Sequence, residues 1–150
     1  MLFANCTWNF KDVTFDKAVA IYTNATATMN NVIINDSNDV YALWITAGAK
    51  SVTLNEVTTN CPNGRAIAIK DQYVDSPRKV TLSIKDSTFS SAKKAAVLVT
   101  NTAGATINAD NVDISNVSAD NTNLVWVDNG ASYQNISNVT VTGCTAIVEP

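Results

Sequence analysis

An internal repeat constrains the fold of this chain more than any other feature. The segment FKDVTFDK at residues 10–17 recurs five times, as MNNVIIND, LNEVTTNC, IKDSTFSS, ADNVDISN and ISNVTVTG. The fourth residue of each copy, Val or Ser, stands at positions 13, 32, 57, 87, 112 and 139, so the steps are 19, 25, 30, 25 and 27 residues. A loosely kept period of this length is typical of a solenoid whose insertions lie in loops.

The residues around each copy predict three short strands per period. Ahead of the copy, apolar residues alternate with Thr, Ser or Asn, the pattern of a strand with one buried face, in TWNF, TATM, SVTL, TLSI, TINA and YQNI. The copy is a second strand, and a third follows after a loop of variable length, in VAIYT, LWIT, IAIKD, VLVTN, VWVDN and TAIVE. Equivalent strands stacked at about 4.8 Å per rung form a parallel β-helix. The prediction is therefore an all-β, single-stranded parallel β-helix (solenoid) of about six coils of three short strands.

A two-residue corner separates the first two strands of every period. The pairs are Lys11-Asp12, Asn30-Asn31, Asn55-Glu56, Lys85-Asp86, Asp110-Asn111 and Ser137-Asn138. The second member is always Asn, Asp or Glu, and Asn and Asp in particular can leave the β region and hydrogen-bond to their own backbone. We expect the corners to stack as a ladder in which Asn side chains bond along the axis of the solenoid.

The composition indicates one globular domain and argues against several partners. A length of 150 residues predicts one domain, and 46% hydrophobic with 15% charged residues is enough apolar material for a core, so we expect the repeat to form a single β-helix domain over residues 1–150. A net charge of −3 without a basic run argues against nucleic acid or an anionic membrane as a partner. No stretch is long and apolar enough for a transmembrane segment, and the first residues lack the pattern of a signal peptide.

No cofactor or metal site is expected from the sequence. The chain has no histidine, and its three cysteines, Cys6, Cys61 and Cys144, stand at no metal-like spacing. We expect all three thiols to be free and structural.

The order of strand, two-residue Asn-type corner, strand, loop and strand resembles the right-handed parallel β-helices of the pectin-lyase-like superfamily. The phrases NCTWNFKDVTF and ISNVTVTGC are similar to coils of exported gut-bacterial β-helix proteins. This resemblance covers nearly the whole chain and implies a right-handed helix and an extracellular or cell-surface location. Lyases, hydrolases, phage tailspikes and adhesins share this fold, so the resemblance does not predict a particular activity.

Enzymes of that superfamily, as the resemblance implies, cut acidic polysaccharides with clustered Asp residues or with calcium and a basic residue. The outward ends of the third strands offer only Lys70, Asp71 and Asp128. The two Asp residues are expected two rungs apart, about 9 to 10 Å, which is too far for one calcium ion. The two arginines, Arg65 and Arg78, are both predicted in loops. Solvated strand ends are therefore favoured over a catalytic site, and no catalytic residue is assigned.

One outward column of the third strand is apolar. If pairs such as Val19/Ile21 and Ile67/Ile69 point inward, the residues between them form a stripe about 20 Å long. They are Ala20, Trp44, Ala68, Leu98 and Trp126. An uncovered stripe is unusual on a soluble monomer, so we expect it to be covered by an insert (71–79 or 115–123), by a second copy, or by a glycan stacked on the two Trp side chains.

The candidate ligand or partner surface is thus the apolar stripe with its polar border. It comprises Trp44, Trp126, Leu98, Ala68, Lys70, Asp71 and Asp128. The expected function is a non-catalytic cell-surface or secreted module that binds carbohydrate or protein, in an adhesion-like role. A fragment or relative of a polysaccharide lyase or hydrolase is the alternative.

A second outward array consists of paired polar columns on the first strand of each period. The pairs are Thr7/Asn9, Thr26/Thr28, Ser51/Thr53, Thr81/Ser83, Thr106/Asn108 and Tyr133/Asn135. Ice-binding β-helices present similar arrays, so ice binding is a minor alternative function. Because Asn, Ser and Tyr interrupt the columns and Thr is common on exposed strand faces, β-propensity is the favoured explanation.

The two ends of the chain show no amphipathic capping helix. An uncapped solenoid exposes unpaired backbone and an apolar cross-section. We therefore expect either part of a longer solenoid or self-association through the open ends or the apolar stripe.

Overall fold

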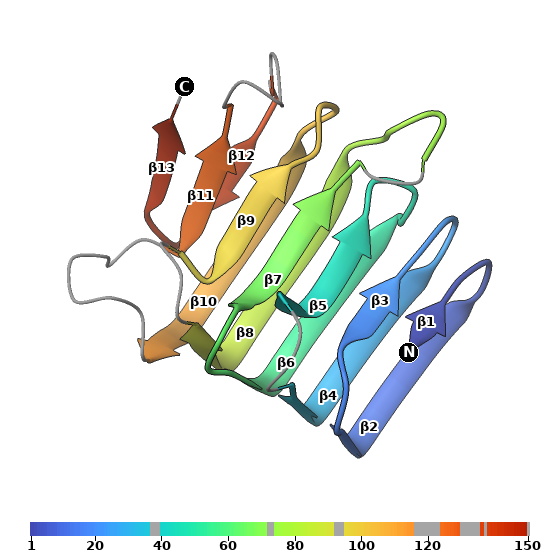
Figure 1. Ribbon diagram of the computed structural model, residues 1–150, viewed down its shortest axis with the longest axis vertical. Helices are drawn as coiled ribbons and strands as arrows, with labels where there is room; N and C mark the ends of the chain where they lie inside the picture. Colours follow the sequence, from blue (N-terminus) through green and yellow to red (C-terminus); the bar gives the residue numbers. More distant parts are fainter. Residues whose placement is uncertain are drawn as a thin grey trace.

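The computed structural model describes residues 1–36, 40–71, 74–91, 95–115, 124–129, 136 and 138–149, and these residues form strands and connecting segments without a helix (Figure 1). The strands are β1 (Leu2–Phe3), β2 (Thr7–Phe15), β3 (Val19–Ile21), β4 (Thr26–Asn35), β5 (Tyr41–Thr46), β6 (Ser51–Cys61), β7 (Arg65–Lys70), β8 (Val80–Ser91), β9 (Val97–Thr100), β10 (Ala105–Ser115), β11 (Val125–Asp128), β12 (Thr140–Thr142) and β13 (Ala146–Glu149).

Alternate strands form two parallel sheets that face each other. The seven-stranded sheet has the order β1-β3-β5-β7-β9-β11-β13, and the six-stranded sheet has the order β12-β10-β8-β6-β4-β2. Each strand pairs with the strand two positions along the chain, as expected when successive coils stack on one another. The predicted all-β parallel solenoid is confirmed at this level.

The prediction of three strands per coil is wrong, because each coil contributes two. The first and second predicted strands are one continuous strand with a bend, as in β4, which spans Thr26–Asn35. Only the corner residue leaves the ladder: Asn30 pairs with Asn55 and Val32 pairs with Val57, whereas Asn31 has no partner in the register. A single residue outside the β region therefore turns the strand without ending it.

The corner residues have the left-handed backbone that the Asn, Asp and Glu column predicts. Their φ angles are 54° at Asp12, 52° at Asn31, 53° at Glu56, 48° at Asp86 and 51° at Asn111. Asn and Asp tolerate this region better than other residues with a Cβ atom, because their short polar side chains hydrogen-bond locally. Glu56 is the exception in the column, and it occupies the left-handed region without that advantage.

Amide and carboxylate side chains also bond along the axis, as the expected corner ladder requires. Asn31 Nδ2 donates to Asp12 Oδ1 over 2.8 Å, and Asn111 Nδ2 donates to Asp86 Oδ1 over 2.7 Å. The neighbouring column has the same arrangement, with Asn55 Nδ2 donating to Asn30 Oδ1 over 2.9 Å. These bonds connect successive coils outside the backbone ladders.

Ser87 occupies the repeat position that other stacked copies fill with Val. Its hydroxyl accepts a hydrogen bond from the Val57 backbone N–H over 3.1 Å and donates to the Lys85 carbonyl over 2.7 Å. The side chain thus supplies the acceptor for Val57 at the bend of β8. This explains why the repeat tolerates Ser here.

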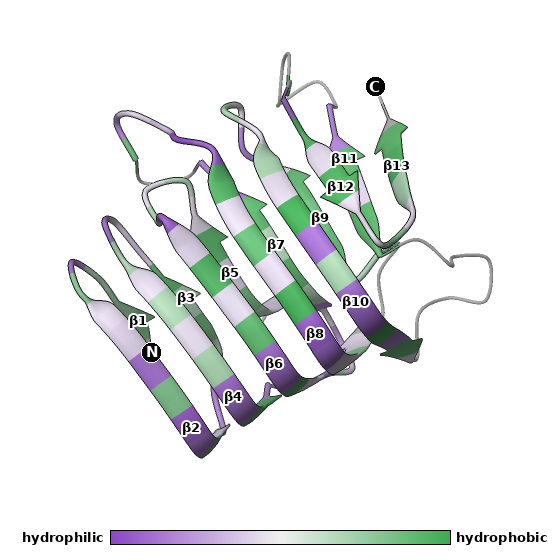
Figure 2. Ribbon diagram, turned by 180° about the vertical axis from the view of Figure 1, so that it is seen from behind, coloured by the Kyte–Doolittle hydropathy of each residue, from purple (hydrophilic) through white to green (hydrophobic). Residues whose placement is uncertain are grey.

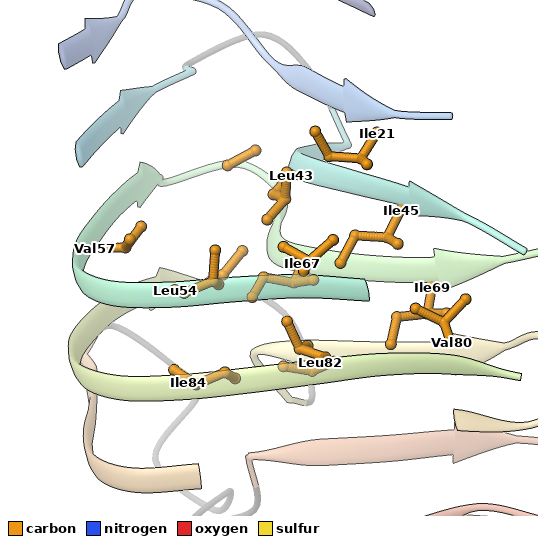
Figure 3. Packing of buried hydrophobic residues seen from close by; sticks show 14 of the residues in the cluster. Ile21, Leu43, Ile45, Leu54, Val57, Ile67, Ile69, Val80, Leu82 and Ile84 are labelled. Carbon is orange, nitrogen blue, oxygen red and sulfur yellow. The ribbon is translucent and has the colours of Figure 1, made fainter. Parts of the chain in front are cut away.

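The core lies between the two sheets and is mostly aliphatic. Ile67 and Ile69 of one sheet point toward Val80 and Leu82 of the other, and all four are fully buried (Figure 3). The predicted inward pairs of the seven-stranded sheet, from Val19/Ile21 to Val125/Val127, are all buried. Apolar and polar bands alternate along the six-stranded sheet, as expected for strands with one buried face (Figure 2).

Aromatic side chains fill the core beneath the first coil. The Phe3 ring lies 4.8 Å from the rings of both Trp8 and Phe10, and Phe10 and Phe15 are 5.4 Å apart. Later coils place smaller residues at the positions of Trp8 and Phe10, for example Ala27 and Met29 in β4. Phe3 and Phe15 belong to the core, and the partly buried rings of Trp8 and Phe10 pack against it.

The sixth coil departs from the predicted register. The sixth copy should place Val139 over Val112, but Thr140 pairs with Thr106 and Val141 pairs with Ile107. The predicted strand YQNI at 133–136 lies outside the described residues, apart from Ile136. The chain then leaves β12 through Gly143 and enters β13 at Ala146, so this coil has no second arm.

The three cysteines are free, as expected, but their environments differ. Cys61 is buried, Cys144 is partly buried and Cys6 is exposed. Burial raises the pKa of the Cys144 thiol. Cys61 belongs to the core and Cys144 packs against it, whereas the Cys6 side chain is exposed to solvent.

Candidate functional site

The register aligns the predicted apolar stripe on the outer face of the seven-stranded sheet. Ala20 pairs with Trp44, Trp44 with Ala68, Ala68 with Leu98, and Leu98 with Trp126. The column continues to Leu2 at one end and Ile147 at the other. We call these residues the apolar column.

The centre of the apolar column is not open to solvent. Ala68 is 0% exposed and Leu98 is 5% exposed, although both lie on the outer side of the sheet. Arg65 supplies part of the cover: its Nε donates to the Ala95 carbonyl over 2.9 Å, and its guanidinium carbon lies 5.0 Å from the centre of the Trp126 ring. The side chain thus extends across the outer face from β7 toward β11.

Arg65 corrects the prediction that both arginines lie in loops. It begins β7 and is 6% exposed, whereas Arg78 does lie between β7 and β8. Burial lowers the pKa of Arg65 from its usual value, and the nearby Tyr41 and Asp128 partly offset this effect. Asp128 and the Trp126 ring therefore provide electrostatic stabilisation for a largely desolvated cation.

The described part of insert 71–79 forms hydrogen bonds with the segments that follow β5 and β9. The Arg78 backbone N–H donates to the Ala47 carbonyl over 3.0 Å, and Asn101 Nδ2 donates to the Arg78 carbonyl over 2.9 Å. The other proposed cover, insert 115–123, lies outside the described residues except for Ser115.

Near the N-terminal coils, the apolar column borders an open groove. The groove has a volume of about 610 Å³ and runs over the outer face of β1, β3 and β5. Its lining consists of Met1, Leu2, Lys17, Ala18, Val19, Ala20, Val40, Tyr41 and Trp44. Leu2 and Val40 are 58% and 61% exposed, so large apolar side chains flank the groove.

Two aromatic residues give this groove its shape. Trp44 has small neighbours on both sides of its column, Ala20 and Ala68, and its ring packs edge-on against Tyr22 at 5.8 Å. Tyr41 pairs in register with Arg65, and Lys70 Nζ lies 5.2 Å from the centre of the Tyr41 ring. Neighbouring residues therefore hold both rings in place.

The remaining predicted site residues each interact with a separate partner. Asp71 Oδ2 accepts hydrogen bonds from the Thr102 hydroxyl over 3.0 Å and from its backbone N–H over 3.4 Å. Asp128 interacts with Arg65, and Lys70 lies against Tyr41. Among the described residues, no group of three Asp, Glu, Cys or His side chains could hold a metal ion.

Sequence reasoning missed Tyr41, Arg65 and Lys17 as parts of this face. The sequence signal was a pair of adjacent apolar residues in each strand, Ala42-Leu43 and Ala66-Ile67. Both members of each pair are buried. This break in the alternation reverses the facing of Tyr41 and Arg65, which strict period-two counting places inside. Lys17 gave no signal, because it reaches the groove from the connection before β3.

Comparison with known proteins identifies no family. No family model matches the chain, and neither a curated protein nor a solved structure gives a significant match. The part of the chain that the structure describes contains no helix capable of crossing a lipid bilayer.

Proposed function

We propose that this protein is a non-catalytic extracellular or cell-surface module that binds carbohydrate through the groove at Trp44. The observation that carries the proposal is an open groove of about 610 Å³ lined by Tyr41, Trp44 and Lys17. This volume lies within the range of about 300 to 1,000 Å³ that is usual for small-ligand sites.

The chemistry of the lining suits a sugar ring. An indole face offers a large, rigid contact area for the C–H face of a pyranose, at little conformational cost. Because Tyr22 and the neighbouring alanines already position Trp44, little order has to be gained on binding. The ammonium groups of Lys17 and Lys70 can donate hydrogen bonds to hydroxyl or carboxylate oxygens at the border.

The finer fold proposal is a right-handed β-helix of the pectin-lyase type, supported by the bent strands and the Asn-type corners. A polysaccharide lyase or hydrolase is the second candidate function, on the strength of that likeness. The engagement of Asp71 by Thr102 and of Asp128 by Arg65 favours binding without cleavage.

The test is a panel of soluble polysaccharides, assayed for binding by calorimetry and for release of reducing ends. We expect at least one ligand to bind without release, and Trp44→Ala to weaken that binding by at least about tenfold, or 1.4 kcal/mol. Trp126→Ala is the matched control, because Trp126 lies in the same column but against Arg65 rather than in the groove.

The control should keep the affinity of the natural chain. If Trp44→Ala and Trp126→Ala both fold and lose the same affinity for polysaccharide, the binding site does not lie in the groove. Release of reducing ends that Asp71→Ala abolishes would replace the binding proposal with the enzymatic one.

A further inference from the structure

A regular array of uncharged polar side chains covers the outer side of the six-stranded sheet, ahead of the corners. Its first column is Thr7, Thr26, Ser51, Thr81, Thr106 and Thr140, and its second column is Asn9, Thr28, Thr53, Ser83, Asn108 and Thr142. We call these twelve residues the hydroxyl array. The two sheets lie opposite each other (Figures 1 and 2), so this outer side faces away from the sheet that carries the groove at Trp44.

The register of the sixth coil makes this array more regular than the sequence suggested. Thr140 and Thr142 occupy the rung that had been predicted for Tyr133 and Asn135. Eight of the twelve positions are therefore Thr and two are Ser. No aromatic ring interrupts the columns.

The polar atoms of the hydroxyl array are available to solvent. The hydrogen bonds among the described residues engage none of its twelve side chains, whereas the Asn columns at the corners bond to one another. Between the two columns, the inward residues Val52, Leu82 and Ile107 are buried in the core. The buried residues thus fix the backbone of the array, while its polar side-chain atoms face solvent.

The array has the geometry of a two-dimensional lattice. Rungs repeat at about 4.8 Å, and outward residues on one strand repeat at about 6.7 Å, so the six rungs span about 24 Å. These repeats are close to oxygen spacings on the faces of an ice crystal. A water molecule that bridges two such hydroxyl groups forms hydrogen bonds whose enthalpy is nearly that of a direct hydrogen bond.

Charged side chains border the array without entering it. The next outward column, at the corner, contains Lys11, Lys85 and Asp110. A charge within the array would bind its own hydration shell and break the lattice. High β-propensity explains the choice of Thr, but it does not explain the exclusion of charge from all twelve positions.

We propose that the hydroxyl array binds ice. The occupant is the ordered water of a crystal face, held by hydroxyl and methyl groups at matched spacing on a rigid sheet. This function does not depend on the carbohydrate groove, which uses the other face of the tube.

The test measures freezing hysteresis, crystal shape and ice recrystallisation with the full chain. We expect a gap between melting and freezing, faceted crystals and slowed recrystallisation. Thr53→Tyr places a ring in the middle of the array and should abolish all three. Thr58→Tyr changes the same residue type in the same strand, β6, beyond the corner, and should leave them unchanged.

Circular dichroism establishes that each variant is folded, and Thr81→Tyr serves as a second array variant should Thr53→Tyr unfold. Absence of all three effects for the natural chain overturns the proposal. So does full activity in a folded array variant, or equal loss in Thr58→Tyr. Loss confined to the array variants, with polysaccharide binding intact, supports it.

Discussion

Gly143→Ala is expected to cause a large loss of stability for the addition of a single methyl group. Gly143 has a φ of 78°, and a Cβ atom there would overlap the backbone oxygen of Ala109 in the coil below. The left-handed backbone alone costs a residue with a Cβ atom roughly 1 to 2 kcal/mol. The steric overlap adds to this cost, because a backbone atom cannot rotate away.

The damage should be greatest in the last coil. We expect the free energy of unfolding to fall by at least about 2 kcal/mol and the backbone amides of β12 and β13 to lose protection from hydrogen exchange. Thr142→Ala is the matched control, since Thr142 is exposed and its change should cost less than about 0.5 kcal/mol. Unchanged protection in Gly143→Ala would show that β12 does not pair with β10 as described.

The second large effect concerns the corners. Asn31→Val should lower the free energy of unfolding by about 2 to 3 kcal/mol, because a β-branched residue at positive φ is strained and the 2.8 Å bond to Asp12 is lost. Asn31→Gly removes the same bond but tolerates the same backbone. It should cost less than about 1 kcal/mol in denaturant unfolding.

Glu56 is a corner residue at positive φ where a substitution is expected to increase stability. Glu56→Asn should raise the free energy of unfolding by up to about 1 kcal/mol, because Asn favours the left-handed region and can join the corner ladder. If Asn31→Gly and Asn31→Val were equally destabilising, backbone conformation would not be the reason for the Asn, Asp and Glu column.

The repeating features of the fold could be predicted because each has its own physical cause. Alternation placed Ile67 and Ile69 in the core, and the corner column placed Asn31 and Asn111 at positive φ. Merging of the first two strands could not be foreseen. A single left-handed residue bends the ladder without ending it, and the sequence pattern of a bend resembles that of a two-strand corner.

The sixth coil was mispredicted because pattern and geometry disagree there. The segment ISNVTVTG matches the repeat, yet β12 pairs with the residues of β10 that lie ahead of the corner, and Gly143 then lies against Ala109. The groove at Trp44 was only half predictable. Trp44 belongs to the apolar column, whereas Tyr41 and Arg65 face outward because the alternation breaks at Ala42 and Ala66.

Successive coils stack in parallel register, and this stacking makes β12 the last rung of the six-stranded sheet. Paired spin labels test it most directly, at positions 9 and 108 and at positions 9 and 142, with the three native cysteines replaced. Parallel stacking predicts backbone separations of about 19 Å over four rungs and about 24 Å over five. A separation for the second pair equal to or shorter than that for the first would contradict it.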